Sequence, residues 1–121
     1  MNVLVTGANG QLGNEMRLMA QNSSHHYIFT DVEELDITDF NAILQTVKEK
    51  EIQIIVNCAA YTNVDKAEND FDTANALNNI AVGRLANVAK AQNATLIHIS
   101  TDYVFNGNNH IPYTEDDITD P

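Results

Sequence analysis

Four short apolar runs that alternate with helix-like patterns constrain the fold of this chain more than any other feature. The runs occupy residues 2–6, 27–31, 53–57 and 95–99. Apolar residues recur at helical spacing in the segments between them, at 11–21, 40–47 and 74–88. We expect Thr38 or Asp39 to be the N-cap of the second helix. This alternation predicts parallel strands joined by right-handed helical crossovers.

A glycine-rich turn joins the first run to the first predicted helix. Gly7, Gly10 and Gly13 stand at a G-x-x-G-x-x-G spacing. The first permits a sharp turn, the second lets the backbone approach a pyrophosphate, and the third lets the helix pack close to the strand. With Gln11 and Leu12 in the same turn, the pattern predicts a dinucleotide site at the helix N-terminus. The alternative is a glycine-rich turn that binds no ligand.

Two acidic positions after the second run fit the adenosine end of a dinucleotide. Asp31 ends this run, and an acid there can accept hydrogen bonds from the ribose hydroxyls and repel a 2′-phosphate. No Arg or Lys lies in the glycine turn or directly after Asp31, so charge alone favours NADH over NADPH. We expect Asp36 and Ile37 to flank the adenine. The alternatives are a solvated loop acid at Asp31 and a helix-capping role for Asp36.

The runs and the turn together predict the fold class. The middle of the third run, Ile54 to Val56, is apolar on both faces, which is typical of a sheet covered by helices on both sides. We therefore predict an α/β fold, namely a Rossmann-type doubly wound parallel sheet that is incomplete, with about four strands. Residues from Ser100 onward are rich in Asn, Gly, Pro and acids, and are expected to form a long loop.

The charge balance argues against several classes of partner. Six Lys and Arg face 17 Asp and Glu, giving a net charge of −11. This excess disfavours nucleic acids and anionic membrane surfaces. The sequence shows neither a signal-peptide pattern nor a membrane-spanning apolar run, and Cys58, its one cysteine, cannot form an internal disulfide. We expect a cytoplasmic protein, with Cys58 as a buried small hydrophobic residue. The alternative for Cys58 is a catalytic thiol.

Longer segments of the chain carry a family resemblance. Residues 6–13, 56–68, 100–107 and 112–117 closely resemble the dTDP-4-dehydrorhamnose reductase family of extended short-chain dehydrogenases/reductases. The resemblance implies hydride transfer from NADPH or NADH to the C4 ketone of dTDP-4-dehydro-L-rhamnose, a nucleotide-linked deoxysugar, giving dTDP-L-rhamnose. A Ser/Thr, a Tyr and a Lys perform this chemistry in the family.

A homodimer is one expected outcome of the open sheet edge that four strands would leave.

The same resemblance assigns individual residues to the site. Thr101, with Ser100 as the alternative, would orient the ketone, although a strand-end hydroxyl can also simply cap the loop. The resemblance places residues around the cofactor (Ala59, Ala60, Tyr61, Thr62) and near the sugar (Val64, Thr101, Tyr103). Tyr103 has packing under the loop as its alternative, and Asn78 would support the active-site backbone or be an ordinary polar helix position. Some family members use an acid at the position of Glu15 to contact a divalent metal such as Mg²⁺, but no metal site is predicted here.

The Tyr-x-x-x-Lys pair of the family is absent. The four tyrosines are followed four positions later by Asp31, Asp65, Gly107 and Asp117. We therefore expect residues 1–121 to be an NAD(P)-binding Rossmann domain truncated before that pair, without the C-terminal substrate domain and inactive alone. The alternatives are a nucleotide-sugar epimerase or dehydratase of the same superfamily, and a non-catalytic nucleotide-binding module.

Overall fold

Four parallel strands form one sheet in the computed structural model, which describes residues 1–67, 69–102 and 104–120. The strands are β1 (Asn2–Thr6), β2 (His26–Phe29), β3 (Ile54–Asn57) and β4 (Thr95–His98), in the spatial order β2-β1-β3-β4. Leu4 of β1 is aligned with Ile28 on one side and Ile55 on the other. The chain passes from β1 to β2 on one side and then crosses to β3 on the other side of β1, so the strand order reverses between β1 and β3. Open α/β sheets bind ligands at such a point.

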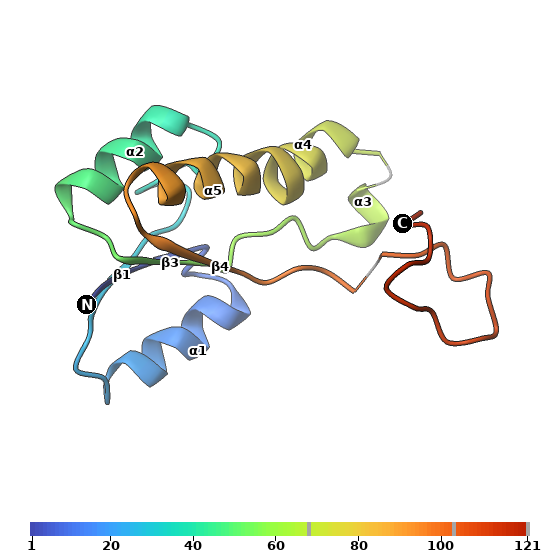
Figure 1. Cartoon of the computed structure of the whole chain (residues 1–121), viewed down its shortest axis with the longest axis horizontal. Helices are drawn as coiled ribbons and strands as arrows, with labels where there is room; N and C mark the ends of the chain where they lie inside the picture. Colours follow the sequence, from blue (N-terminus) through green and yellow to red (C-terminus); the bar gives the residue numbers. More distant parts are fainter. Residues whose placement is uncertain (68, 103, 121) are drawn as a thin grey trace.

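Helices cover both faces of the sheet, as predicted (Figure 1). Helix α1 (Gln11–Ala20) lies on one face, while α2 (Phe40–Glu49) and α5 (Ala81–Ala91) lie together on the other. Successive strand residues point to opposite faces, so two cores form. Leu4 and Ile55 pack with α2 and α5, whereas Val3, Val5 and Val56 form a smaller cluster that Met16 of α1 joins. The predicted Rossmann-type parallel sheet of about four strands is confirmed.

The cover of the two faces is unequal. Inward-facing side chains of α2 and α5, including Ile43 and Leu85, are completely buried. On β4, Ile97 is aligned with Val56, on the α1 side of the sheet, and is 46% exposed. Ile99, just beyond β4, is 50% exposed. One helix therefore leaves the apolar surface at β4 open on this side.

The boundaries of the second strand and second helix depend on two aspartates. The predicted strand 27–31 is wrong at its end, because β2 stops at Phe29. Asp31 instead lies in a loop, where its carboxylate accepts hydrogen bonds from backbone N–H groups. Asp39 is the N-cap of α2, and its side chain accepts hydrogen bonds from the second and third residues of the helix at 2.9 and 3.1 Å. Of the two predicted caps, Asp39 is therefore the correct one.

The predicted long third helix is present but is not a uniform α-helix. It consists of α4 (Phe71–Asn75), the π-helix η1 (Ala76–Ile80) and α5 in direct succession. A short helix that the sequence pattern did not predict, α3 (Val64–Ala67), precedes it. In the described part of the chain after His98 there is no further helix or strand, which confirms the predicted loop.

The loop after β4 extends away from the sheet and returns toward itself (Figure 1). The backbone N–H of Asp120 donates to the carbonyl of Val104 at 3.0 Å and closes it. The rings of Phe105 and Tyr113 stack inside it with centroids 4.2 Å apart. None of the described helices has both the length and the apolar character that crossing a membrane requires.

Candidate functional site

A cavity of about 520 Å³ opens where β1 and β3 end. Three loops form its wall: the glycine turn after β1, the segment between β2 and α2, and the segment after β3. The π-helix η1 adds one side chain. The lining residues are Gly7, Asn9, Gly10, Asp31, Val32, Leu35, Asp36, Ile37, Cys58, Ala59, Ala60 and Leu77. The cavity therefore lies at the point of strand reversal, where an open parallel sheet is expected to bind its ligand.

The three glycines have different surroundings. Gly7 has φ +63°, and a Cβ there would lie 2.5 Å from the backbone nitrogen of Ala59, so only glycine fits between the two loops. A Cβ on Gly13 would lie 2.5 Å from Cα of Ala8, because α1 packs directly on the turn. A Cβ on Gly10 would meet only the carbonyl oxygen of Gly7, at 3.3 Å. A Cβ at Gly10 would therefore make one close contact, whereas those at the other two glycines would overlap with backbone.

The start of α1 fits a pyrophosphate. Gly10 is the N-cap of this helix and has no side chain with which to cap the first N–H groups. Those donors belong to the first turn, which begins at Gln11 and continues through Leu12. Uncapped N–H groups and the helix dipole attract anions. Gln11 and Leu12 are exposed and contribute here through their backbone, since neither side chain lines the cavity.

Asp31 is held beside the glycine turn. Its Oδ2 accepts the backbone N–H of Asn9 at 2.9 Å, and its Oδ1 accepts that of Val32 at 2.8 Å. The N–H of Asp31 donates to the Glu34 carboxylate at 2.8 Å. An ionised carboxylate has about four acceptor sites, so Asp31 keeps capacity to accept the hydroxyls of a ribose.

Asp36 and Ile37 form the neighbouring part of the wall. The carboxylate of Asp36 accepts both the hydroxyl and the N–H of Thr38, at 2.6 and 2.8 Å. These hydrogen bonds, with the nearby positive charge of Arg84, lower the pKa of Asp36, so it is ionised at neutral pH. Arg84 also donates to the carbonyl of Thr38 and ties this loop to α5. Asp36 thus stabilises a local turn, while the capping of α2 is left to Asp39.

A polar network links three strand ends beneath the cavity. The Thr6 hydroxyl donates to Oδ1 of Asn57 at 2.6 Å, and the Asn57 amide nitrogen lies 3.0 Å from Nδ1 of His98. Thr6 and Asn57 are both 1% exposed. Oδ1 of Asn57 also accepts the N–H of Ala59 at 3.2 Å, which positions the loop that contacts Gly7. Sequence reasoning missed this network, although a polar residue at the end of each aligned apolar run was a usable signal.

The π-helix η1 directs two adjacent residues to the site. Leu77 lines the cavity, and the Asn78 side chain makes paired hydrogen bonds with the backbone of Tyr61, at 2.8 Å to its N–H and 3.0 Å to its carbonyl. Asn78 therefore supports this backbone as expected. The Tyr61 hydroxyl donates to Asp70 at 3.3 Å. Partial burial and the Asp70 carboxylate raise the pKa of Tyr61, the opposite of what an activated tyrosine acid requires.

The structure brings some of the predicted residues together and leaves others apart. Those that line the cavity are Gly7, Gly10, Asp31, Asp36, Ile37, Ala59 and Ala60. Thr62 and Thr101 are exposed and are not part of its lining, although Thr101 follows β4 at the same end of the sheet. Tyr103 lies outside the described residues, as does the side chain of Val64, whose backbone belongs to α3.

Further lining residues carried no clear sequence signal. Asn9 was hidden inside the glycine motif, Leu77 belongs to the apolar pattern of residues 74–88, and nothing in the sequence marked Leu35. Cys58 is half-buried at the cavity rather than enclosed in the core, which corrects the expectation of full burial. Burial raises the pKa of the Cys58 thiol, so it is protonated at neutral pH.

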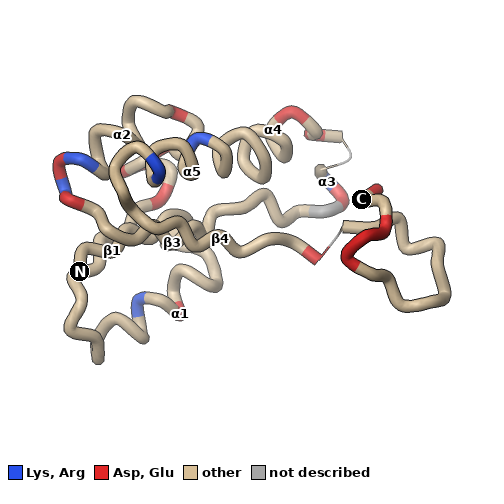
Figure 2. Tube along the Cα trace, viewed as in Figure 1, with Lys and Arg blue, Asp and Glu red and all other residues tan. Residues whose placement is uncertain are grey.

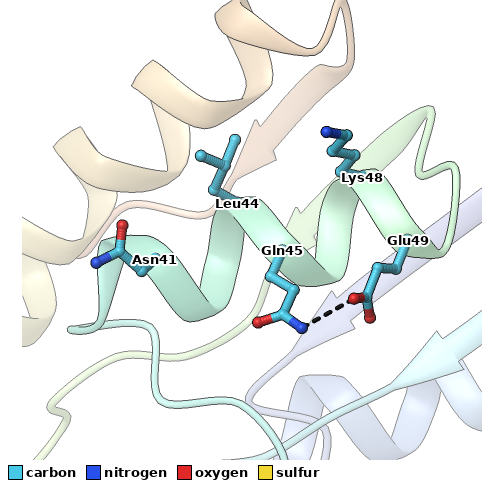
Figure 3. Close-up of a pocket in the computed structure, with 5 residues that line it drawn as sticks. All are labelled: Asn41, Leu44, Gln45, Lys48 and Glu49. Carbon is cyan, nitrogen blue, oxygen red and sulfur yellow. Dashed lines mark hydrogen bonds between the residues drawn. The ribbon is translucent and has the colours of Figure 1, made fainter.

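A second hollow, of about 480 Å³, lies on the outer face of α2 (Figure 3). Its lining residues all come from this one helix: Asn41, Leu44, Gln45, Lys48 and Glu49. The amide of Gln45 donates to the Glu49 carboxylate at 2.8 Å, so two of these polar groups bond to each other. A surface formed by a single helix does not surround a ligand, and we place the functional site at the strand ends.

The parallel sheet, the glycine turn and the cavity at the strand reversal define a protein of the Rossmann-type class. More particularly, the chain belongs to the RmlD substrate binding domain family, whose model matches residues 1–121. The predicted resemblance to dTDP-4-dehydrorhamnose reductases is confirmed. The chain spans about 40% of the length of the curated relatives that it matches.

Two solved structures and one curated relative illustrate this kinship. A dTDP-4-dehydrorhamnose reductase from Clostridium acetobutylicum is 43% identical, with a TM-score of 0.92 over 100% of this chain and 43% of its own. The Bacillus anthracis enzyme of that name, solved in complex with NADP, is 38% identical, with a TM-score of 0.89 over 99% and 43%. The methionine adenosyltransferase 2 subunit beta of Pongo abelii is 40% identical over 98% of this chain and 37% of its own.

Proposed function

We propose that this chain binds NADH or NADPH in the cavity between β1 and β3 and forms the cofactor-binding part of a reductase. The proposed reaction reduces the C4 ketone of dTDP-4-dehydro-L-rhamnose to dTDP-L-rhamnose, with the bound dihydronicotinamide supplying the hydride. The observation that carries the proposal is the cavity that Gly10 and Asp31 line together, between the uncapped start of α1 and the fixed carboxylate of Asp31.

Each part of the dinucleotide has a corresponding part of the cavity. The N–H groups that begin α1 at Gln11 suit the pyrophosphate. Asp31 suits the adenosine ribose, because its carboxylate can accept hydroxyl hydrogens while two backbone bonds fix its direction. Ile37 offers an apolar surface to the adenine beside the ionised Asp36. The small side chains after β3, those of Ala59 and Ala60, leave room for the nicotinamide ribose.

The chemical step needs a proton donor. Residues 1–121 contain no Tyr-x-x-x-Lys pair to supply it. Tyr61 does not substitute for it, because partial burial and Asp70 raise its pKa. We propose that Thr101 orients the ketone, with Val64 and Tyr103 near the sugar, and that the acid lies outside this chain. Residues 1–121 alone should therefore bind cofactor without reducing the ketone. The nucleotide-linked deoxysugar is the proposed substrate.

Calorimetric titration of the purified chain with NADH and NADPH tests cofactor binding. Gly10→Val places a side chain in the cavity at the start of α1, where the extended backbone (φ −74°, ψ 176°) suits valine and the new Cβ would lie 3.3 Å from the carbonyl oxygen of Gly7. Gly83→Val is the matched control, since a Cβ at Gly83 meets nothing within 4 Å. We expect saturable binding that Gly10→Val abolishes and Gly83→Val retains, with unchanged circular dichroism in both. Equal binding by both variants would place the cofactor elsewhere or exclude it.

A non-catalytic nucleotide-binding module is the second candidate. It is favoured by the 40% identity to a relative named as the subunit of another enzyme, which is as close as that of several reductases. The reading frame downstream of codon 121 separates the two. A Tyr-x-x-x-Lys pair encoded there supports the reductase if the longer protein also oxidises NADPH in the presence of dTDP-4-dehydro-L-rhamnose. The loss of absorbance at 340 nm measures this oxidation. Cofactor binding by a product without that pair and without turnover supports the module.

A further inference from the structure

We propose that Arg17 is the specificity residue that allows a 2′-phosphate to bind beside Asp31, so that the chain accepts NADPH as well as NADH. This inference rests on the proposed binding of a nicotinamide dinucleotide at the glycine turn. It names a residue outside the glycine motif, one that the charge pattern along the sequence did not indicate.

The fold brings the guanidinium of Arg17 from α1 back to the glycine turn. Its Nε donates to the carbonyl of Ala8 at 3.4 Å, and its Nη2 donates to Oδ1 of Asn9 at 3.3 Å. Its carbon Cζ lies 4.6 Å from the centroid of the Phe29 ring, at the end of β2. A cation over an aromatic face is attracted by the ring. Arg17 is exposed, but three contacts hold its charge beside the turn.

Asn9 connects this cation to the acid that is proposed to bind the ribose. Its side chain accepts from Arg17, while its backbone N–H donates to Oδ2 of Asp31 at 2.9 Å. One cavity-lining residue thus contacts both a positive and a negative group. A ribose with a free 2′-hydroxyl needs only the carboxylate of Asp31, whereas a 2′-phosphate there is repelled by it and needs a nearby cation.

Arg17 has the donors for this role. A guanidinium has five N–H groups, and the bonds to Ala8 and Asn9 use two of them. The remaining groups suit phosphate oxygens, with which arginine forms paired, charge-assisted bonds. Figure 2 shows a blue segment, the colour of Lys and Arg, on α1, and Arg17 is the only Lys or Arg in this helix. Arg84 reaches a different loop, where it donates to the carbonyl of Thr38 beside Asp36.

Titration of the purified chain with 5′-AMP and 2′,5′-ADP tests the inference, because the two probes differ only in the 2′-phosphate. We expect Arg17→Gln to weaken 2′,5′-ADP binding about fivefold to tenfold, the range for losing a partly exposed charge-assisted bond, and to change 5′-AMP binding less than twofold. Arg17→Lys keeps the charge and should lose less than Arg17→Gln. Lys90→Gln is the matched control, because it removes one cation from the last turn of α5 and should change neither probe.

Each outcome bears on one of the two proposals. If Arg17→Gln weakens the binding of both probes equally, Arg17 only supports the turn, and the inference is overturned. If Arg17→Gln changes the affinity for neither probe, the inference is overturned as well. If wild-type protein binds neither probe, the proposed cofactor site itself fails. If it binds 5′-AMP alone, that site stands and the inference fails.

Discussion

Two glycines in helices provide a test of how closely α1 packs on the glycine turn. Gly13 lies in α1 and Gly83 in α5, and both are changed to alanine. A Cβ at Gly13 would lie 2.5 to 2.6 Å from three backbone atoms of Ala8 and Gly7. A Cβ at Gly83 would have nothing within 4 Å. The same substitution therefore meets a rigid backbone in one helix and open solvent in the other.

The two substitutions should change the free energy of unfolding in opposite directions. Alanine gains about 1 kcal/mol over glycine in a helix interior at either position. At Gly13, overpacking against backbone costs about 3 kcal/mol, the upper end of the range for a tightly packed site, because backbone atoms cannot change rotamer. The net expectation is a loss of about 2 kcal/mol for Gly13→Ala and a gain of about 1 kcal/mol for Gly83→Ala.

Urea denaturation followed by circular dichroism measures both effects. A difference of about 3 kcal/mol separates the two midpoints by at least about 1 M for a domain of this size. Calorimetric titration with NADH adds a second readout, since a shifted α1 also displaces the N–H groups proposed to bind phosphate. If both variants are stabilised, or both are unchanged, α1 does not approach the turn as closely as these distances state.

Three further predictions concern the loops around the cavity. Asp39→Ala should cost about 1 kcal/mol of unfolding free energy in urea, because it removes the N-cap of α2, and Asp39→Ser should restore most of it; equal losses would contradict the capping role. Asn57→Ala should cost about 1–3 kcal/mol in the same assay by leaving the buried Thr6 hydroxyl without its acceptor, and should weaken NADH binding; unchanged stability would contradict this. The pKa of Asp36 is lowered in the fold, so its stabilising effect is present above the unfolded-state pKa and is lost as pH falls through the folded-state value. Wild type should therefore exceed Thr38→Val in stability at neutral pH, with the difference disappearing in acid, and a difference independent of pH would contradict the proton linkage.

The fold was predictable because its signals are local. Each apolar run is a continuous segment, and the glycine turn lies directly between one run and its helix, so neither depends on distant contacts. The end of β2 was not predictable in this way. Asp31 leaves the strand because its carboxylate binds the N–H of Asn9, 22 positions earlier, and this pairing exists only once β1 and β2 are aligned.

The site was predictable in part. The glycines and Asp31 follow the spacing of a dinucleotide-binding turn, but the network of Thr6, Asn57 and His98 depends on strand register, which the sequence does not state. Arg17 was overlooked for a related reason. A helix returns residues three or four positions apart to the same face, and Arg17 contacts the turn only because α1 packs back on the sheet.

The π-helix η1 has a consequence for how this part of the protein can evolve. A π-helical turn holds one residue more than an α-helical turn, so it is gained or lost by inserting or deleting a single codon. Deleting Asn79 or Ile80, the two positions of η1 that follow Asn78, would rotate everything before the deletion by about 100° relative to α5, the angle that one residue spans in an α-helix. The helix would survive, but Asn78 would no longer face Tyr61 while Leu85 kept its place in the core. A one-codon change can thus detach the cavity wall from its support without disturbing the core, which makes the length of this segment as much a determinant of the site as the identity of its residues.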